Sequence, residues 1–158
     1  MWVIVGDMES RFRGLYHFSI DSKGRVNVPA KFRSLLKPDA HDTFIISLAP
    51  DGCLRIYPED TWVVDETELI SRRETPDTLA HKRYLYSILT DSTMDGQGRI
   101  SLSQEQMEAA GIAKEVTFVG MGNYIEIWDK VKYARYRKEL QSGNFTQMHY
   151  DAQAGTPK

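Results

Sequence analysis

Two short stretches of the chain combine residue types that can do chemistry, and both follow an Asp-x-x-Gly-Arg pattern. The first reads DSKGR from Asp21 to Arg25, and the second reads DGQGR from Asp95 to Arg99. Two carboxylates brought together can act as an acid–base pair when their environments push their pKa values apart. An Asp that opens a turn has another use, because its carboxylate accepts hydrogen bonds from the turn amides. We favour the structural role for Asp21 and Asp95 and keep acid–base catalysis as the alternative.

The other reactive residue types give no second catalytic pattern. The four histidines are scattered and lack the spacing of metal ligands on one helix, so the sequence predicts no metal site. Cys53 is the only cysteine, which excludes an internal disulfide and fits a reducing compartment. Gly24 and Gly98 are single turn glycines and form no phosphate-binding loop. The sequence therefore predicts neither an enzyme nor a bound cofactor.

Positive charge is concentrated around the first of the two turns. Positions 11–37 hold seven Lys or Arg and one acidic residue, although the whole chain has a net charge of −2. A hairpin with Lys and Arg at its tip can follow phosphates, and an Arg can reach guanine edges in the major groove of DNA. The alternative is an ordinary solvated surface. The residues predicted to contact double-stranded DNA are Arg11, Arg13, Lys23, Arg25, Lys31 and Arg33.

The second turn keeps the pattern of the first without its charge. Gln97 stands where the first turn has Lys23, and residues 91–111 hold one Arg against four acidic residues. We therefore expect Arg99 to be structural, paired with a turn Asp, and we expect part of the role of Arg25 to be structural as well. The residues predicted to build the two turns are Asp21, Gly24, Asp95, Gly98 and Arg99.

The elements that must position these turns are written twice along the chain. Each copy reads as a strand, a turn, a second strand, a short helix and a hairpin, and the first strand shows apolar alternation over residues 16–20. Halves of this size are marginal as separate domains, so we expect them to share one core. We divide the chain into a first repeat (15–62), a helical connector (63–90), a second repeat (91–134), and the end of a C-terminal helix with a loose tail (135–158).

The stretch FRGLYHFSIDSKGRVNVPAKFR, with MDGQGRISL and VTFVGMGNYIEIWD further along, resembles the bacterial MraZ family over residues 12–136. The resemblance implies an α+β, mainly β fold in which two AbrB-like (SpoVT/AbrB) swapped-hairpin halves interlock as a pseudo-dimeric barrel with flanking helices. It implies a DNA-binding regulator, expected to be a repressor, of the division and cell-wall gene cluster and its own promoter. It also implies a ring-shaped homo-oligomer on tandem promoter repeats. The family's Asp-x-x-x-Arg pairs fall on Asp21/Arg25 and Asp95/Arg99.

Three further expectations concern location, the N-terminus and alternative functions. We expect a cytoplasmic, nucleoid-associated protein without a membrane partner, because no apolar run is long enough to span a bilayer and MWVIVGDM lacks the basic start of a signal peptide. The family usually begins near Arg11, so residues 1–10 are either an extension or a misassigned start, with Met8 as a candidate. The alternative functions are an antitoxin-like AbrB regulator that holds a partner protein, and a small barrel enzyme that uses Asp21 and Asp95.

Overall fold

The computed structural model describes residues 11–155, so the expectations for residues 1–10 lie outside the described part of the chain. Within the described residues the strands are β1 (Leu15–Ser19), β2 (Arg25–Asn27), β3 (Thr43–Leu48), β4 (Leu54–Pro58), β5 (Thr90–Thr93), β6 (Arg99–Ser101), β7 (Glu115–Gly120) and β8 (Ile125–Asp129). The helices are α1 (Ala30–Arg33), the 3-10 helix η2 (Pro38–Ala40), α2 (Glu59–Ser71), α3 (Pro76–Ile88), α4 (Gln104–Ala109), α5 (Lys130–Ser142) and α6 (Phe145–Ala154).

Strand pairing joins the two repeats to each other. A six-stranded sheet has the order β1-β7-β8-β4-β3-β5, so β1 of the first repeat pairs with the second repeat, and β5 of the second pairs with the first. Because β1 corresponds to β5, β3 to β7 and β4 to β8, this order is unchanged when the repeats are exchanged. A pseudo-twofold axis therefore passes between the central strands β4 and β8.

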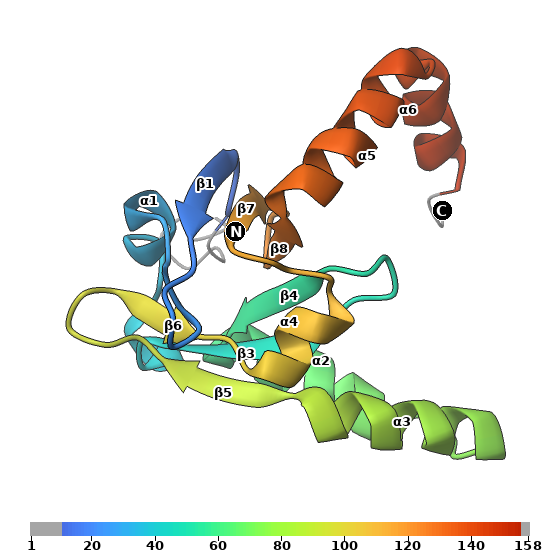
Figure 1. Ribbon diagram of the computed structural model, residues 1–158. Coiled ribbons are helices and arrows are strands. Elements are labelled where there is room, and N and C mark those ends of the chain that lie inside the picture. Colours follow the sequence, from blue (N-terminus) through green and yellow to red (C-terminus); the bar gives the residue numbers. More distant parts are fainter. Residues whose placement is uncertain (1–10, 156–158) are drawn as a thin grey trace, which may run out of the picture.

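The pseudo-dimeric arrangement is present but the predicted barrel is wrong, because the six-stranded sheet is open, with β1 and β5 at its edges. The two strands outside this sheet, β2 and β6, have three residues each. They pair with one another in a separate two-stranded sheet and do not continue the larger one. The fold class is therefore α+β with one open sheet and one small ladder (Figure 1).

The two repeats share one hydrophobic core, as the sequence predicts. Phe32 of the first repeat and Phe118 of the second are both fully buried in the same cluster. The ring of Phe18 meets that of Phe118 edge-on at 5.8 Å, across the β1–β7 pair. Neither repeat alone could bury these aromatic side chains away from solvent, so the shared core and the exchanged strands stabilise each other.

Helices α3, α4, α5 and α6 begin at residues whose side chains cap them. Thr75 and Ser103 each form a capping box at the start of α3 and α4. The expected loose tail is wrong for Phe145–Ala154, which forms α6, with the Asn144 side chain accepting a hydrogen bond from the Gln147 amide at 3.1 Å. The N-cap at Asn144 therefore starts a helix in this segment. The predicted domain boundaries stay predictions.

Two helical arms leave the β core. Helix α2 follows β4 in the first repeat and α5 follows β8 in the second, so the two helices occupy equivalent positions. Figure 1 shows α3 on one arm and α5 with α6 on the other, diverging from the core. The two turns of the Asp-x-x-Gly-Arg pattern lie at the other side of the core, next to α1 and β6.

Candidate nucleic-acid interface

Each Asp-x-x-Gly-Arg stretch forms a tight turn held by its own carboxylate. Asp21 Oδ1 accepts hydrogen bonds from the amides of Lys23 and Arg25, both at 2.9 Å, and Oδ2 accepts one from Arg25 Nε at 2.7 Å. Gly24 has a φ of +80°, a conformation that favours glycine. The bond to Asp21 fixes the Arg25 guanidinium at one end and leaves other donors of its fork for a phosphate or a base.

The second turn repeats this geometry closely. Asp95 Oδ1 accepts from the amides of Gln97 at 2.9 Å and Arg99 at 3.0 Å, and Oδ2 accepts from Arg99 Nε at 2.8 Å. Gly98 has a φ of +75°. The two turns therefore have the same internal bonds, although only the first carries a Lys at its tip.

The two turns interlock through reciprocal backbone bonds. The Val28 amide donates to the Gly98 carbonyl at 3.0 Å, and the Leu102 amide donates to the Gly24 carbonyl at 2.8 Å. Between them, Val26 lies opposite Ile100 in the β2–β6 ladder. Each turn is thus braced by the strand that leaves the other, and the pair forms one rigid unit.

Cross-repeat side-chain contacts add to this unit. Arg99 Nη1 lies 3.9 Å from Asp21 Oδ2, so the Arg99 guanidinium reaches both turn carboxylates. Asn27 Nδ2 donates to the Gln97 carbonyl at 3.0 Å and holds the tip of the second turn. The sequence did not indicate the role of Asn27, because its partner lies in the other repeat.

The electrostatics of the turns disfavour catalysis by the carboxylates. The Arg25 amide, followed by its guanidinium and the Lys23 amide, lowers the pKa of Asp21 to about 2 against a smaller opposing effect of burial. The Arg99 amide and guanidinium lower the pKa of Asp95 in the same way. An acid–base pair needs one carboxyl whose pKa is raised so that it holds a proton near neutral pH. Asp21 and Asp95 are therefore both ionised at neutral pH, and neither can serve as the proton donor that the enzyme alternative requires.

The six basic residues predicted to contact DNA are distributed over three places. Lys23 is exposed at the tip of the first turn, and Arg25 lies half-buried behind it. Arg11 and Arg13 flank the buried Phe12, whose backbone pairs with Gly122 at the opposite end of β1. DNA contact by these residues stays a prediction.

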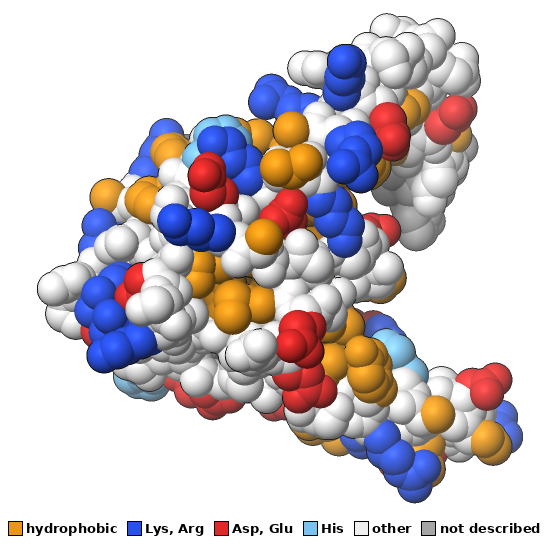
Figure 2. Space-filling view, in the orientation of Figure 1, with side chains coloured by type: hydrophobic (Ala, Val, Ile, Leu, Met, Phe, Trp, Pro, Cys, Tyr) orange, Lys and Arg blue, Asp and Glu red, His pale blue; other side chains and the backbone are white. Residues whose placement is uncertain are grey.

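Helix α1 lies beside the segment of Arg11 and Arg13. The ring of Phe12 meets that of Phe32, on α1, edge-on at 5.5 Å, and Lys31 is exposed on the same short helix. Figure 2 shows Lys and Arg side chains gathered on the side of the molecule that carries α1 and the β5–β6 turn. Positive charge from several elements therefore faces the same side.

The Arg33 side chain of the first repeat contacts the second repeat. Its guanidinium lies against Gly98, so closely that a Cβ at that glycine would overlap it, and its Nε is buried without a hydrogen-bond partner. At the equivalent position of the second repeat, Met107 lies near Gly24, with its methyl 3.9 Å from where a Cβ would stand. Arg33 therefore brings positive charge from the first repeat to the turn whose tip is the neutral Gln97.

A partly buried polar cluster lies at the pseudo-twofold axis. Arg55 of β4 faces Glu126 of β8 in register, with Arg55 Nε 3.9 Å from Glu126 Oε2, and Trp128 Nε1 donates to Glu126 Oε1 at 3.0 Å. Burial and the neighbouring Glu126 raise the pKa of the Cys53 thiol to about 12. The thiol stays protonated at neutral pH, so Cys53 is a packing residue and not a nucleophile.

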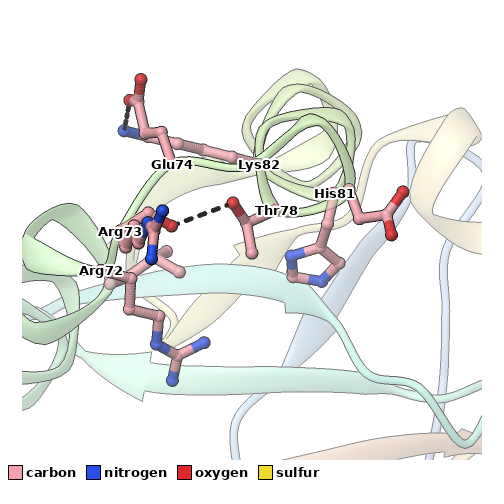
Figure 3. Close-up of a pocket in the computed structure, with 8 residues that line it drawn as sticks. Arg72, Arg73, Glu74, Thr78, His81 and Lys82 are labelled. Carbon is pink, nitrogen blue, oxygen red and sulfur yellow. Dashed lines mark hydrogen bonds and ion pairs between the residues drawn. The ribbon is translucent and has the colours of Figure 1, made fainter.

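A surface cavity of about 190 Å³ lies between α2 and α3 (Figure 3). Lys82 pairs with Glu74 at 3.7 Å, and Thr78 Oγ1 donates to the Arg73 carbonyl at 3.1 Å. The same Thr78 completes the capping box of α3. These polar groups serve the α2–α3 connection, and the cavity adds no support to an enzymatic function.

Two other classes of site have no counterpart within residues 11–155. In that part of the chain, no group of three or more His, Cys, Asp or Glu side chains is placed to hold a metal ion. None of the helices described there is long and apolar enough to cross a membrane.

Comparison with known proteins gives the family of the chain. The family model described as "MraZ protein, putative antitoxin-like" matches residues 11–83 and again residues 89–154. The chain belongs to the MraZ family. The two matches divide the chain into the same two repeats that exchange strands in the structure. The family resemblance predicted from the sequence is confirmed.

Curated relatives agree over most of the chain. The "Transcriptional regulator MraZ" of Natranaerobius thermophilus is 36% identical over 135 residues, which cover 83% of this chain and 90% of the relative. The protein of the same name from Desulforamulus reducens is 38% identical over 132 residues, covering 83% and 90% of the two chains. That of Polaromonas sp. is 33% identical over 140 residues, covering 89% and 97%. MraZ proteins are non-enzymatic regulators, which confirms the prediction that the chain is not an enzyme.

Proposed function

We propose that this MraZ chain is a sequence-specific DNA-binding regulator whose interlocked turns approach the duplex with Lys23 foremost. The observation that carries the proposal is the asymmetry of two otherwise matching turns. Both have the same carboxylate-bound geometry, yet only the first exposes a Lys at its tip. A positive side chain at a rigid tip is suited to phosphate contact, and the Arg25 fork behind it is suited to a guanine edge.

The exchanged strands support a more specific fold relationship. Each repeat contributes a hairpin, β1–β2 or β5–β6, whose outer strand pairs with the sheet of the other repeat. We interpret these as the swapped hairpins of two AbrB-like halves joined in one chain. The interlock holds both turns at fixed separation, so a docked turn loses little conformational freedom on binding.

Regulation by this chain requires more affinity than one turn can supply. A few phosphate contacts give weak, strongly salt-dependent binding. A ring of copies on tandem repeats gains affinity through effective concentration when the spacings match. We propose that the chain assembles in this way on repeats in its own promoter and represses the division and cell-wall genes. Nucleoid association would follow from this activity.

The antitoxin-like alternative is less well supported. It calls for a tail that folds when it meets a partner protein, whereas Phe145–Ala154 is already helical in the isolated chain. The DNA-reading proposal uses the turns and their charge directly, so we favour it.

A swap of the two tip residues tests the proposal. Lys23→Gln gives the first turn the tip of the second, and Gln97→Lys does the reverse. The turn bonds at these positions come from the backbone amides of Lys23 and Gln97, so both variants keep their turn geometry. In gel-shift titrations against the DNA upstream of the protein's own coding sequence, at two salt concentrations, we expect Lys23→Gln to lower the affinity for DNA. The slope of log K against log salt should fall by about 0.9 for each phosphate that the variant no longer neutralises.

The control is Gln97→Lys, which we expect to keep at least the affinity of the unmodified protein. Arg25→Ala and Arg99→Ala extend the comparison. We expect Arg25→Ala to lower DNA affinity more, and we expect Arg99→Ala to lower the free energy of unfolding at least as much as Arg25→Ala does, because Arg99 contacts both turn carboxylates. Oligomeric state is measured for each variant. Unchanged affinity and salt slope for a folded Lys23→Gln protein would show that the tip of the first turn does not contact DNA.

A further inference from the structure

The tip of the second turn carries an exposed amide side chain that is not used inside the molecule. The backbone amide of Gln97 donates to Asp95 Oδ1 at 2.9 Å, and its backbone carbonyl accepts from Asn27 Nδ2 at 3.0 Å. Within residues 11–155, no group forms a hydrogen bond with the Gln97 side chain. The carbonyl and NH2 groups of this side chain are therefore both available to a ligand.

The tip of the second turn is held at more points than the tip of the first. The Asn27 side chain crosses from the first repeat to hold the Gln97 carbonyl. Ser101 stands at the equivalent place in the second repeat, and in the described part of the chain no group bonds to the Lys23 carbonyl. The backbone of Gln97 is thus fixed at both its N–H and its C=O, whereas that of Lys23 is fixed at its N–H only.

A fixed backbone suits one kind of DNA contact more than another. A Lys reaches a phosphate as a point charge on a flexible stem, so the exact position of its backbone matters little. A Gln reads adenine only when its carbonyl accepts from N6 while its NH2 group donates to N7. This paired geometry needs a side chain that leaves the backbone at a defined place, and placing it in advance lowers the entropy lost on binding. The brace at Gln97 therefore fits base reading.

The other charged groups beside the second turn leave the base edge to Gln97. The Arg33 guanidinium lies against the next residue, Gly98, where it can meet a phosphate. Arg99 Nε and Nη1 lie 2.8 Å and 3.9 Å from the two turn carboxylates, so this guanidinium is engaged within the protein. Positive charge near the tip thus comes from a neighbouring element, and the tip itself can carry a neutral side chain.

We propose that Gln97 reads an adenine in the major groove and is the specificity residue of the second turn. The inference rests on the proposed DNA-binding function and deepens it, because it gives the two tips different tasks. Lys23 supplies affinity through a phosphate, and Gln97 supplies discrimination between bases. Because the two turns form one rigid unit, the adenine lies at a fixed distance from the base pairs under the first turn.

Selection from a library of random-sequence duplex DNA tests the assignment. The unmodified protein should enrich sequences that have an adenine at one fixed position. Gln97→Ala should lose this preference by roughly tenfold or more and keep the rest of the selected sequence. Gln97→Glu should move the preference toward cytosine, because a carboxylate accepts from cytosine N4. A Gln97 with a purely structural role would produce neither change.

Replacement of the adenine itself tests which atoms meet. In gel shifts on the selected duplex, 7-deazaadenine removes the N7 acceptor and should lower the affinity of the unmodified protein but not that of Gln97→Ala. The slope of log K against log salt should be unchanged in Gln97→Ala, since no phosphate contact is lost. Gln97→Lys should keep its affinity through the added charge and lose the preference for adenine.

Two further variants provide a control and a test of the brace. Gln153→Ala removes an exposed glutamine from α6, far from the turns (Figure 1), and should change neither affinity nor base preference. Asn27→Ser introduces the residue found at the equivalent place in the second repeat. It should weaken the adenine preference and leave the salt slope unchanged, because Asn27 positions Gln97 and does not touch a phosphate. Circular dichroism checks the folding of each variant.

The possible failures can be told apart. An unaltered base preference in a folded Gln97→Ala protein would overturn the inference, and so would an equal loss from 7-deazaadenine with and without the Gln97 side chain. The full adenine preference in Asn27→Ser would overturn the positioning role of Asn27. Failure of the proposed function looks different, because the unmodified protein would then enrich no sequence and Lys23→Gln would leave the salt slope unchanged.

Discussion

The Arg33 side chain brings positive charge from the first repeat to the second turn, and replacing it tests what that charge contributes to stability and to DNA binding. Its Nε is buried and has no hydrogen-bond partner, while its guanidinium lies against Gly98. Met107 occupies the equivalent place near Gly24 and fills it with apolar atoms alone. Arg33→Met therefore gives the first repeat the side chain that the second already uses, with similar length and no buried donor.

The expected gain in stability follows from the unsatisfied Nε. Leaving a buried polar group without a partner costs about 1–3 kcal/mol. Part of this is offset because the Arg33 stem makes packing contacts that Met must replace, so we expect a net stabilisation of about 1 kcal/mol. For a domain of this size, that corresponds to a rise in Tm of about 2–4 °C. Thermal unfolding at fixed protein concentration measures it, because assembly makes Tm depend on concentration.

The same variant should lose DNA affinity, which separates the two roles of Arg33. If its guanidinium reaches a phosphate, the slope of log K against log salt falls by about 0.9. A stability loss above about 1 kcal/mol would refute the reasoning, because it would show that the buried guanidinium is satisfied and stabilising. Unchanged DNA affinity with a higher Tm would show that Arg33 is a packing residue only.

Two further predictions concern the turns. Because the folded pKa of Asp21 is about 2, below its unfolded value of 3.8, its ionisation contributes stability that is present above pH 3.8 and lost as pH falls toward 2. Asp21→Asn should therefore be less stable than the unmodified protein at pH 5, and the difference should shrink in acid denaturation below pH 4; a constant difference would contradict it. Gly24→Ala should cost more than the roughly 1–2 kcal/mol of a left-handed alanine, because its Cβ would meet the Leu102 carbonyl oxygen at 2.7 Å. The loss of stability caused by Gly98→Ala should stay near that range, since the Arg33 side chain can move away. Urea unfolding measures the free energy of unfolding of both variants. Equal losses would show that the Leu102 backbone shifts as easily as the Arg33 side chain.

Local features of this fold were predictable from the sequence, and partners between the repeats were not. The turn glycines, the Ser103 capping box and the helix beginning at Pro76 depend on neighbours within a few residues, and the structure shows them all. Whether β2 and β6 close a barrel depends on the pairing of distant strands, which three-residue strands do not reveal. The same limit applies to Arg33, whose short helix indicates nothing about a contact with Gly98.

Several distinctive features of the molecule follow from joining two halves in one chain. In a symmetric dimer, a residue at the twofold axis meets its own copy, so an Arg at the place of Arg55 would face an identical Arg. Here the equivalent residue is Glu126, and the axis carries opposite charges instead.

The same freedom explains the other differences between the repeats. One turn can keep Lys23 while the other takes Gln97, and one short helix can carry Arg33 where the other carries Met107. One arm can become acidic and the other basic, which a twofold dimer of identical halves cannot achieve.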